Sequence, residues 1–104
     1  MSKLVRDRIP DTIKAEGKVP SVIYIKGIEY GENIGDKLYE EVAELLEWGA
    51  NRVEEAADVL EVSLALIMHM NKLDRTEALK SVLLALGEKY ERKGGFSDGA
   101  VLHL

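Results

Sequence analysis

Apolar residues recur at the three- and four-residue spacing of an amphipathic helix over much of the chain. After residue 36 this spacing predicts a helix whose apolar stripe consists of Leu38, Val42, Leu45 and Leu46. It predicts two further helices, over residues 52–70 and 75–92, and the latter has the inward-facing residues Leu79, Val82, Leu83, Leu86 and Tyr90. Helices joined by short turns pack antiparallel, so the pattern predicts an antiparallel helical bundle.

The first third of the chain is less regular. A proline in a first turn and a glycine after the last turn predict a short helix over residues 10–16. The β-branched and aromatic residues at 21–26 predict a strand, with residues 28–30 or 100–104 as its pairing partner. Residues 31–36 read as the loop that leads into the next helix. The expected fold is therefore mainly α, with a short N-terminal helix and a small β element.

The two turns between the predicted helices have recognisable boundary residues. In the first turn Gly49 ends one helix and Asn51 caps the next, with Glu54 three residues further on. In the second turn Asp74 is the cap, and Glu77 occupies the reciprocal position of a capping box. The whole chain of 104 residues is expected to form one domain, with no linker and no low-complexity segment.

Two acidic pairs flank the first turn, and they consist of Glu41 with Glu44 and Glu55 with Asp58. Each pair is spaced i, i+3, which puts both carboxylates on one helix face. An antiparallel hairpin sets Glu44 opposite Glu55, and it sets Glu41 opposite Asp58. Carboxylates this close repel one another unless a hard divalent cation such as Mg²⁺ or Mn²⁺ binds between them. The alternative is that all four acids belong to ordinary solvated helix faces.

Several other residues are open to more than one interpretation. Glu61, three residues past Asp58, is a further metal ligand, a supporting acid or a partly exposed glutamate. His69 and His103 match no zinc spacing, so both are expected to be structural. Trp48 in the first turn is a packing residue or, alternatively, a surface on which a base stacks.

Composition narrows the function classes. Hydrophobic residues make up 46% of the chain, which is too many for a disordered protein. A net charge of −5 argues against a broad nucleic-acid surface, which needs clustered lysine and arginine. The chain has no cysteine, its first residues lack an apolar signal region, and no apolar run is long enough to span a membrane. We therefore expect a cytoplasmic protein with no nucleic-acid or membrane partner.

The motif E-x-x-E, followed after a short interval by E-x-x-D, resembles the signature of the all-α NTP pyrophosphatases, the MazG-like superfamily. The resemblance is to a small single-domain branch that is similar to phosphoribosyl-ATP pyrophosphohydrolase. The blocks that carry it are K-L-V-R-D-R-I-P at 3–10, K-L-Y-E-E-V-A-E-L at 37–45, E-E-A-A-D-V-L-E-V at 54–62 and R-K-G-G-F at 92–96. The resemblance covers most of the chain and is weakest over residues 21–35.

The resemblance implies Mg²⁺-dependent hydrolysis of a nucleoside triphosphate to a nucleoside monophosphate and pyrophosphate, including house-cleaning of non-standard nucleotides. It implies a metal site formed by Glu41, Glu44, Glu55 and Asp58. Mn²⁺ is an alternative ion, and Glu41 and Glu44 would be the catalytic carboxylates. The basic residues that become candidates for phosphate contact are Lys3, Arg6, Arg8, Lys89, Arg92 and Lys93. For Arg6 the competing interpretation is an ion pair with Asp7 that holds the N-terminus onto the bundle.

Two competing functions would use the same acids. One is phosphoribosyl-ATP hydrolysis, which needs the same metal site and a different pocket for base and ribose. The other is a helical oligomer without catalysis, whose acids bind a metal for stability. Residues 59–70 are apolar nearly all round, and a small domain cannot bury such a helix alone. We therefore expect a homo-oligomer, either a dimer or a tetramer.

Overall fold

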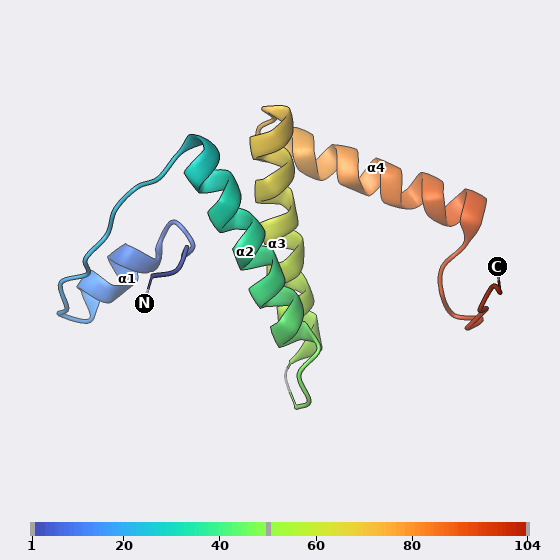
Figure 1. The fold of residues 1–104 in the computed structure, drawn as a ribbon, viewed down its shortest axis with the longest axis horizontal. Coiled ribbons are helices and arrows are strands. Elements are labelled where there is room, and N and C mark those ends of the chain that lie inside the picture. The colour runs from blue at the N-terminus through green and yellow to red at the C-terminus, as the bar shows by residue number, and fades with distance from the viewer. Residues whose placement is uncertain (1, 50, 104) are drawn as a thin grey trace.

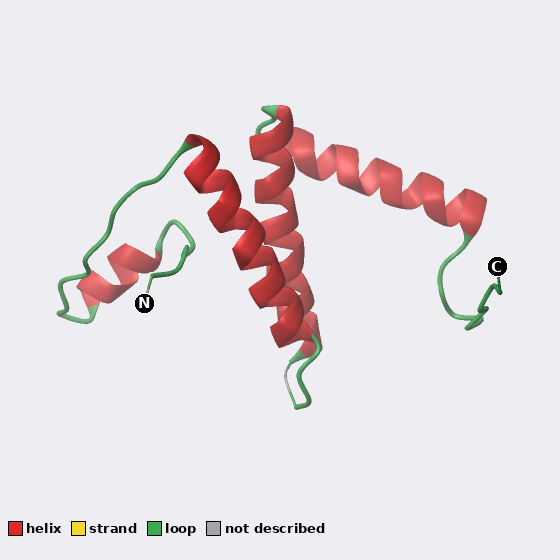
Figure 2. Cartoon of the chain, in the orientation of Figure 1, coloured by secondary structure: helices red, strands yellow, loops and turns green. Residues whose placement is uncertain are grey.

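The computed structural model describes residues 2–49 and 51–103, and over these residues the chain forms four α-helices and no strand (Figure 1, Figure 2). The helices are α1 (Ile9–Ala15), α2 (Gly27–Leu45), α3 (Arg52–Asn71) and α4 (Arg75–Lys93). The predicted fold class, mainly α, is confirmed. No helix in the described part of the chain combines the length and apolar character needed to cross a membrane.

The centre of the molecule is an antiparallel hairpin of α2 and α3, which lie side by side (Figure 1). The turn between them uses Gly49, whose left-handed backbone, with φ of 81°, costs a glycine little. Asn51 then caps α3, because its side-chain oxygen accepts hydrogen bonds from the backbone nitrogens of Val53 (3.1 Å) and Glu54 (3.2 Å). The predicted hairpin and its cap are confirmed, whereas Ala50 of the turn lies outside the described residues.

Few apolar side chains are fully covered. Ile34 on α2 and Leu64 on α3 are 4% and 1% exposed, and they lie on the two helices that pack together. Ala78, near the start of α4, is 0% exposed. The core therefore follows the α2–α3 hairpin and reaches only the first turns of α4.

α4 leaves the hairpin at the end of α3 and extends away from it (Figure 1). α3 ends where Lys72 takes a left-handed backbone, with φ of 54°. Asp74 and Glu77 then form the predicted capping box, in which Glu77 N donates to Asp74 Oδ1 (2.8 Å) and Asp74 N donates to Glu77 Oε1 (3.0 Å). Among the described helices α4 contacts α3 alone, so most of its residues are exposed.

The start of α2 corrects the prediction from sequence. The helix begins at Gly27, so the strand expected at 28–30 and the loop expected at 31–36 are wrong, because both stretches are helical. Tyr30 and Ile34 extend, at four-residue spacing, the apolar stripe that was recognised further along the helix. That periodicity outweighs the helix-weakening effect of the glycines that made the stretch resemble a loop.

The predicted small β element is absent from the described residues. Residues 21–26 have no regular structure, and the expected partner at 100–103 follows α4 on the opposite side of the molecule (Figure 2). A strand needs a neighbour that satisfies its backbone hydrogen bonds, and the extended α4 carries this neighbour out of reach. Leu104 of the predicted pair lies outside the described residues.

Candidate metal centre and groove

The hairpin brings three of the four predicted carboxylates into one group. One oxygen from each of Glu41, Glu55 and Asp58 lies within 4.8 Å of the others. Glu41 comes from α2, and the other two come from successive turns of α3. Oxygens at this separation can all contact one cation, and carboxylate oxygen is a ligand that both Mg²⁺ and Mn²⁺ prefer.

Glu41 is the buried member of this group. It is 6% exposed, and Lys37 Nζ lies 3.0 Å from its Oε1. Its other oxygen, Oε2, and Oε2 of Glu55 are buried and have no hydrogen-bond partner among the described residues. A buried carboxylate oxygen without a partner is costly, because it loses its hydration and gains no replacement. The residues therefore fit a divalent cation, which would supply the partner that both oxygens lack.

Glu44, the fourth predicted carboxylate, lies one turn along α2 from Glu41. It forms a second group with Glu40 and Glu41, again with one oxygen from each residue within 4.8 Å of the others. The negative charge of Glu41 raises the pKa of Glu44, and the charges of Glu55 and Glu40 add to this effect. Glu41 thus belongs to both groups, and Glu40 is an acid that the motif alone did not single out.

Lys37 is a cation within these groups that the sequence did not reveal as a site residue. Its Nζ lies 3.0 Å from Glu41 Oε1 and 3.4 Å from Glu40 Oε1. Burial alone would lower the pKa of Lys37, but the hydrogen bonds and charges of Glu41 and Glu40 outweigh burial and raise it. Lys37 therefore stays charged and offsets part of the acidic charge. A signal for this role was available, because Lys37 and Glu41 are spaced i, i+4.

The N-terminal segment reaches the same carboxylates through Arg6. Its guanidinium forms an ion pair with Asp58, and both side chains remain partly exposed to solvent. Arg6 therefore pairs with Asp58 rather than with Asp7, and this pair holds the N-terminus against the hairpin. It also places a positive charge beside the carboxylate group.

Glu61 lies one turn beyond Asp58 on α3, yet it joins neither carboxylate group among the described residues. Arg75, at the start of α4, donates two hydrogen bonds to it, from Nη2 to Oε1 at 2.8 Å and from Nε to Oε2 at 3.3 Å. The hydrogen bond from Arg75 lowers the pKa of Glu61. Arg75 is a second site residue that the sequence did not reveal, since the contact joins two different helices.

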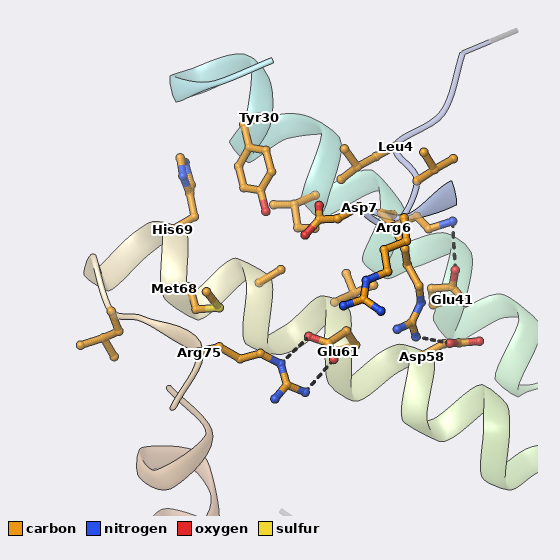
Figure 3. Close-up of a pocket in the computed structure, with 17 residues that line it drawn as sticks. Leu4, Arg6, Asp7, Tyr30, Glu41, Asp58, Glu61, Met68, His69 and Arg75 are labelled. Atoms are coloured by element: carbon orange, nitrogen blue, oxygen red, sulfur yellow. Dashed lines mark hydrogen bonds and ion pairs between the residues drawn. The ribbon is translucent and has the colours of Figure 1, made fainter. Parts of the chain in front are cut away.

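A groove of about 700 Å³ runs beside the carboxylates (Figure 3). Its volume lies within the range of roughly 300–1,000 Å³ that is usual for small-molecule sites. The cationic side chains that line it are Arg6, Arg8, Lys37 and Arg75. The acids Asp7, Glu41, Asp58 and Glu61 line it as well, and three of the cations form ion pairs with them, so the groove carries both signs of charge.

The other predicted phosphate contacts lie elsewhere. Lys3 borders a separate small depression beside Lys37. The groove is not lined by the last turns of α4, which carry Lys89, Arg92 and Lys93. Trp48 is 96% exposed at the end of the hairpin and also lies outside the groove. Within one chain, therefore, two of the six predicted basic residues, Arg6 and Arg8, line the groove.

Two aromatic residues line the groove as well, at the end away from Glu41 and Asp58 (Figure 3). The ring centroids of Tyr30 and His69 are 5.0 Å apart, and their planes are inclined by 59°. The sequence did not indicate that either residue belongs to a site, because residue 30 falls in a predicted strand and His69 matches no metal-binding spacing. His103 is exposed in the segment that follows α4.

Comparison with known proteins gives little information about function. No family model matches the chain, and no solved structure matches it significantly. An uncharacterized protein of Mycolicibacterium smegmatis is 49% identical over 45 residues, which are 43% of this chain and 46% of that protein. The matched part thus spans about half of the length of that relative. Evidence for function therefore comes from the geometry of the site.

Proposed function

We propose that the protein is a Mg²⁺-dependent nucleotide pyrophosphohydrolase, which cleaves a nucleoside triphosphate to a nucleoside monophosphate and pyrophosphate. The observation that carries the proposal is the carboxylate group of Glu41, Glu55 and Asp58. Two oxygens of this group are buried and have no partner among the described residues, and a groove whose lining includes three arginines lies beside it. Acids that bind a cation and cations that bind phosphates are together what a metal-chelated polyphosphate requires.

The carboxylates would have two different roles, which are metal binding and catalysis. Glu41, Glu55 and Asp58 would hold Mg²⁺, for which Mn²⁺ could substitute, and Glu44 would extend this set from the neighbouring turn. When bound, the cation would neutralise phosphate charge and act as a Lewis acid. Glu41 and Glu44 are the proposed catalytic carboxylates. Glu44 lies at the edge of the group, where a carboxylate can orient an attacking water and accept its proton.

The arginines of the groove would bind the phosphates. Arg6 and Arg8 come from the N-terminal segment and Arg75 from the start of α4, so three separate guanidinium groups line the groove. A guanidinium presents a planar set of donors that matches phosphate oxygens. Glu61 fixes the direction of Arg75 through two hydrogen bonds. The remaining candidates for phosphate contact are Lys3, Lys89, Arg92 and Lys93, of which the last three would act from another copy of the chain.

Two alternatives share this site. Phosphoribosyl-ATP is a second candidate substrate, because its triphosphate would need the same cation and the same arginines. A metal-stabilised oligomer without catalysis is the other alternative, and one observation favours it: Arg6 and Lys37 already compensate two of the acids without a metal. We assign the activity to the cytoplasm, since a chain with no cysteine fits a reducing compartment.

Pyrophosphate release from a panel of standard, damaged and phosphoribosylated nucleotides tests the proposal. The wild type should release pyrophosphate with Mg²⁺ and none with excess EDTA. Glu41→Gln should lower the rate by about 100-fold or more, since even residues that only support metal ligands cost 10–100-fold. Glu32→Gln, an equal change at an exposed acid of the same helix, is the matched control and should keep full activity. Release by no nucleotide of the panel, or full activity of Glu41→Gln, would contradict the proposal.

A further inference from the structure

The end of the groove away from the carboxylates differs in character from the rest. It is formed by Tyr30 from α2 and His69 from α3, with Met68 and Leu73 as apolar neighbours in the lining (Figure 3). The two rings pack against each other with their centroids 5.0 Å apart, and His69 stays exposed. The two rings are inclined to each other by 59°, so a nucleobase would stack on one of them and meet the edge of the other, and stacking on a single aromatic ring already stabilises a bound base.

The position of His69 depends on a glycine in α2. A Cβ atom on Gly31 would lie 3.5 Å from His69 Cδ2, an ordinary contact, but only 3.1 Å from His69 Nε2, so the ring would have to move by a few tenths of an ångström. Glycine weakens a helix interior, so Gly31 is an unfavourable residue for α2 itself. In exchange it lets the imidazole lie directly against the helix. Gly35, four residues further along α2, has no such neighbour, since nothing lies within 4 Å of a Cβ built there.

The polar groups at this end form a small hydrogen-bonding pattern. Asp7 lines the groove between Arg6 and Tyr30 (Figure 3) and has no hydrogen bond or ion pair among the described residues. Burial and the charge of Asp7 raise the pKa of Tyr30, so its hydroxyl keeps its proton. An ionised carboxylate only accepts hydrogen bonds, whereas a phenol can donate one. The site thus offers an acceptor beside a donor.

We propose that this end of the groove binds the base of a nucleotide with its exocyclic group toward Asp7, and that this orientation makes the site prefer a base whose exocyclic group is an amino group. The proposal rests on the proposed function in one respect, which is that the phosphates lie at the carboxylate end. Adenine and cytosine present an amino donor next to a ring-nitrogen acceptor, which complements Asp7 and Tyr30. Hypoxanthine and uracil carry a carbonyl oxygen in place of the amino group, and that oxygen would face the carboxylate of Asp7 and be repelled.

Binding of nucleoside monophosphates tests this inference without any hydrolysis. The affinities of AMP, IMP, CMP, UMP and base-free ribose 5-phosphate are measured by calorimetry or by NMR titration in the presence of Mg²⁺. AMP should bind at least about tenfold more tightly than IMP, and CMP than UMP, because the amino group donates to a charged acceptor. Ribose 5-phosphate should bind most weakly, since it lacks the stacking base.

Paired variants separate the roles of the residues. Asp7→Asn should remove most of the preference for amino bases, because an amide can turn its donor side toward a carbonyl oxygen. Asp98→Asn, the same change at an exposed acid after α4, should keep the preference. Gly31→Ala should lower the affinity for AMP, because it displaces His69, and should leave the affinity for ribose 5-phosphate unchanged. Gly35→Ala should change neither affinity.

The outcomes distinguish this inference from the proposed function. Equal affinities for AMP and IMP, or an unchanged AMP-to-IMP ratio in Asp7→Asn, would overturn the inference even if the protein releases pyrophosphate from triphosphates. The expected ratio in the wild type, with its loss in Asp7→Asn, would uphold the inference even if no triphosphate is hydrolysed. In that second case the proposed function is contradicted and the inference about the base is not.

Discussion

Individual charges at the carboxylate site are compensated unequally. Lys37 neutralises one oxygen of Glu41, and Arg6 neutralises Asp58. Oε2 of Glu55 and Oε2 of Glu41 are buried without a partner among the described residues, and Glu44 adds a further negative charge. The acids of the site therefore repel one another, and this repulsion raises the pKa of Glu44.

Glu44→Gln should slightly raise the melting temperature of the metal-free protein at neutral pH. The charge of Glu41 raises the pKa of Glu44 above its ordinary value of 4.5, so between 4.5 and the raised value the folded state binds more protons than the unfolded state. Stability therefore falls as the pH rises through this window, and above the window the full repulsion remains. Melting curves in EDTA, from about pH 4 to about pH 8, should show this fall in the wild type and a smaller fall in the variant.

Glu32→Gln, at an exposed acid of the same helix, is the control for this experiment and should retain the pH dependence of the wild type. With saturating Mg²⁺ the order of stabilities should reverse, because the wild type gains more from the cation than the variant does. Identical pH profiles for Glu44→Gln and the wild type would show that Glu44 feels no repulsion from its neighbours.

At the scale of elements, the N-terminal segment before α1 contacts the hairpin through the ion pair of Arg6 with Asp58. We predict that Arg6→Ala raises the KM for a nucleoside triphosphate by about five- to tenfold, because an exposed guanidinium would bind a phosphate. The affinity for Mg²⁺ should not fall, since the variant removes a positive charge from beside a proposed metal ligand. Steady-state kinetics combined with a Mg²⁺ titration measures both quantities.

Lys14→Ala, at an exposed cation of α1, serves as the matched control and should change neither quantity. An unchanged KM in Arg6→Ala would mean that the arginine only fastens the N-terminus to the hairpin. A loss of Mg²⁺ affinity with an unchanged KM would mean that it holds Asp58 in place.

The helix ends at the two turns could be predicted from sequence because capping is local. Asn51 bonds to nitrogens two and three residues away, and Asp74 to a nitrogen three residues away, so neither depends on the rest of the fold. The start of α2 could not be predicted in the same way, because Gly27 and Gly31 suggest breaks that packing of Tyr30 and Ile34 overrides. The strand at 21–26 failed for the opposite reason, since pairing depends on a distant segment.

In the candidate site, too, contacts that depend on local spacing could be predicted, whereas contacts between distant segments could not. Spacing within α2 and α3 was sufficient to bring Glu41, Glu55 and Asp58 together, because a short turn fixes the register of the hairpin. The Arg6–Asp58 and Arg75–Glu61 pairs instead join segments that are 52 and 14 residues apart in sequence. No local spacing encodes such contacts, so the cations and aromatic residues of the groove became visible only in three dimensions.

As a whole molecule, the single chain is more open than a compact domain of its size. Its radius of gyration is 17.0 Å, whereas about 13 Å is expected at this length. Its accessible surface is 9176 Å², against about 5,800 Å² for a compact monomer of 11.6 kDa. If a second copy covered the excess of roughly 3,300 Å² on each chain, the two copies would together bury about 6,600 Å², which is as large as the most extensive permanent interfaces.

We predict that the protein is a homo-oligomer, at least a dimer, in which α4 packs against another copy of the chain. The large apolar residues that α4 exposes are Leu83, Leu84, Leu86 and Tyr90. Leu83→Glu should shift the population toward smaller species, and Ser81→Glu, at an exposed polar position on another face of the same helix, should not. Light scattering at micromolar concentration measures the mass, and a monodisperse, active species of 11.6 kDa would contradict the prediction.

We propose that the carboxylates and the groove together cleave a triphosphate between its α- and β-phosphates. The most direct measurement is a ³¹P NMR spectrum of a nucleoside triphosphate incubated with the protein and Mg²⁺, which identifies every phosphorus-containing product. We predict that a pyrophosphate signal and a nucleoside monophosphate signal grow together, and that EDTA prevents both. A spectrum that stays unchanged across the nucleotide panel, or one that shows nucleoside diphosphate and orthophosphate, would contradict the claim.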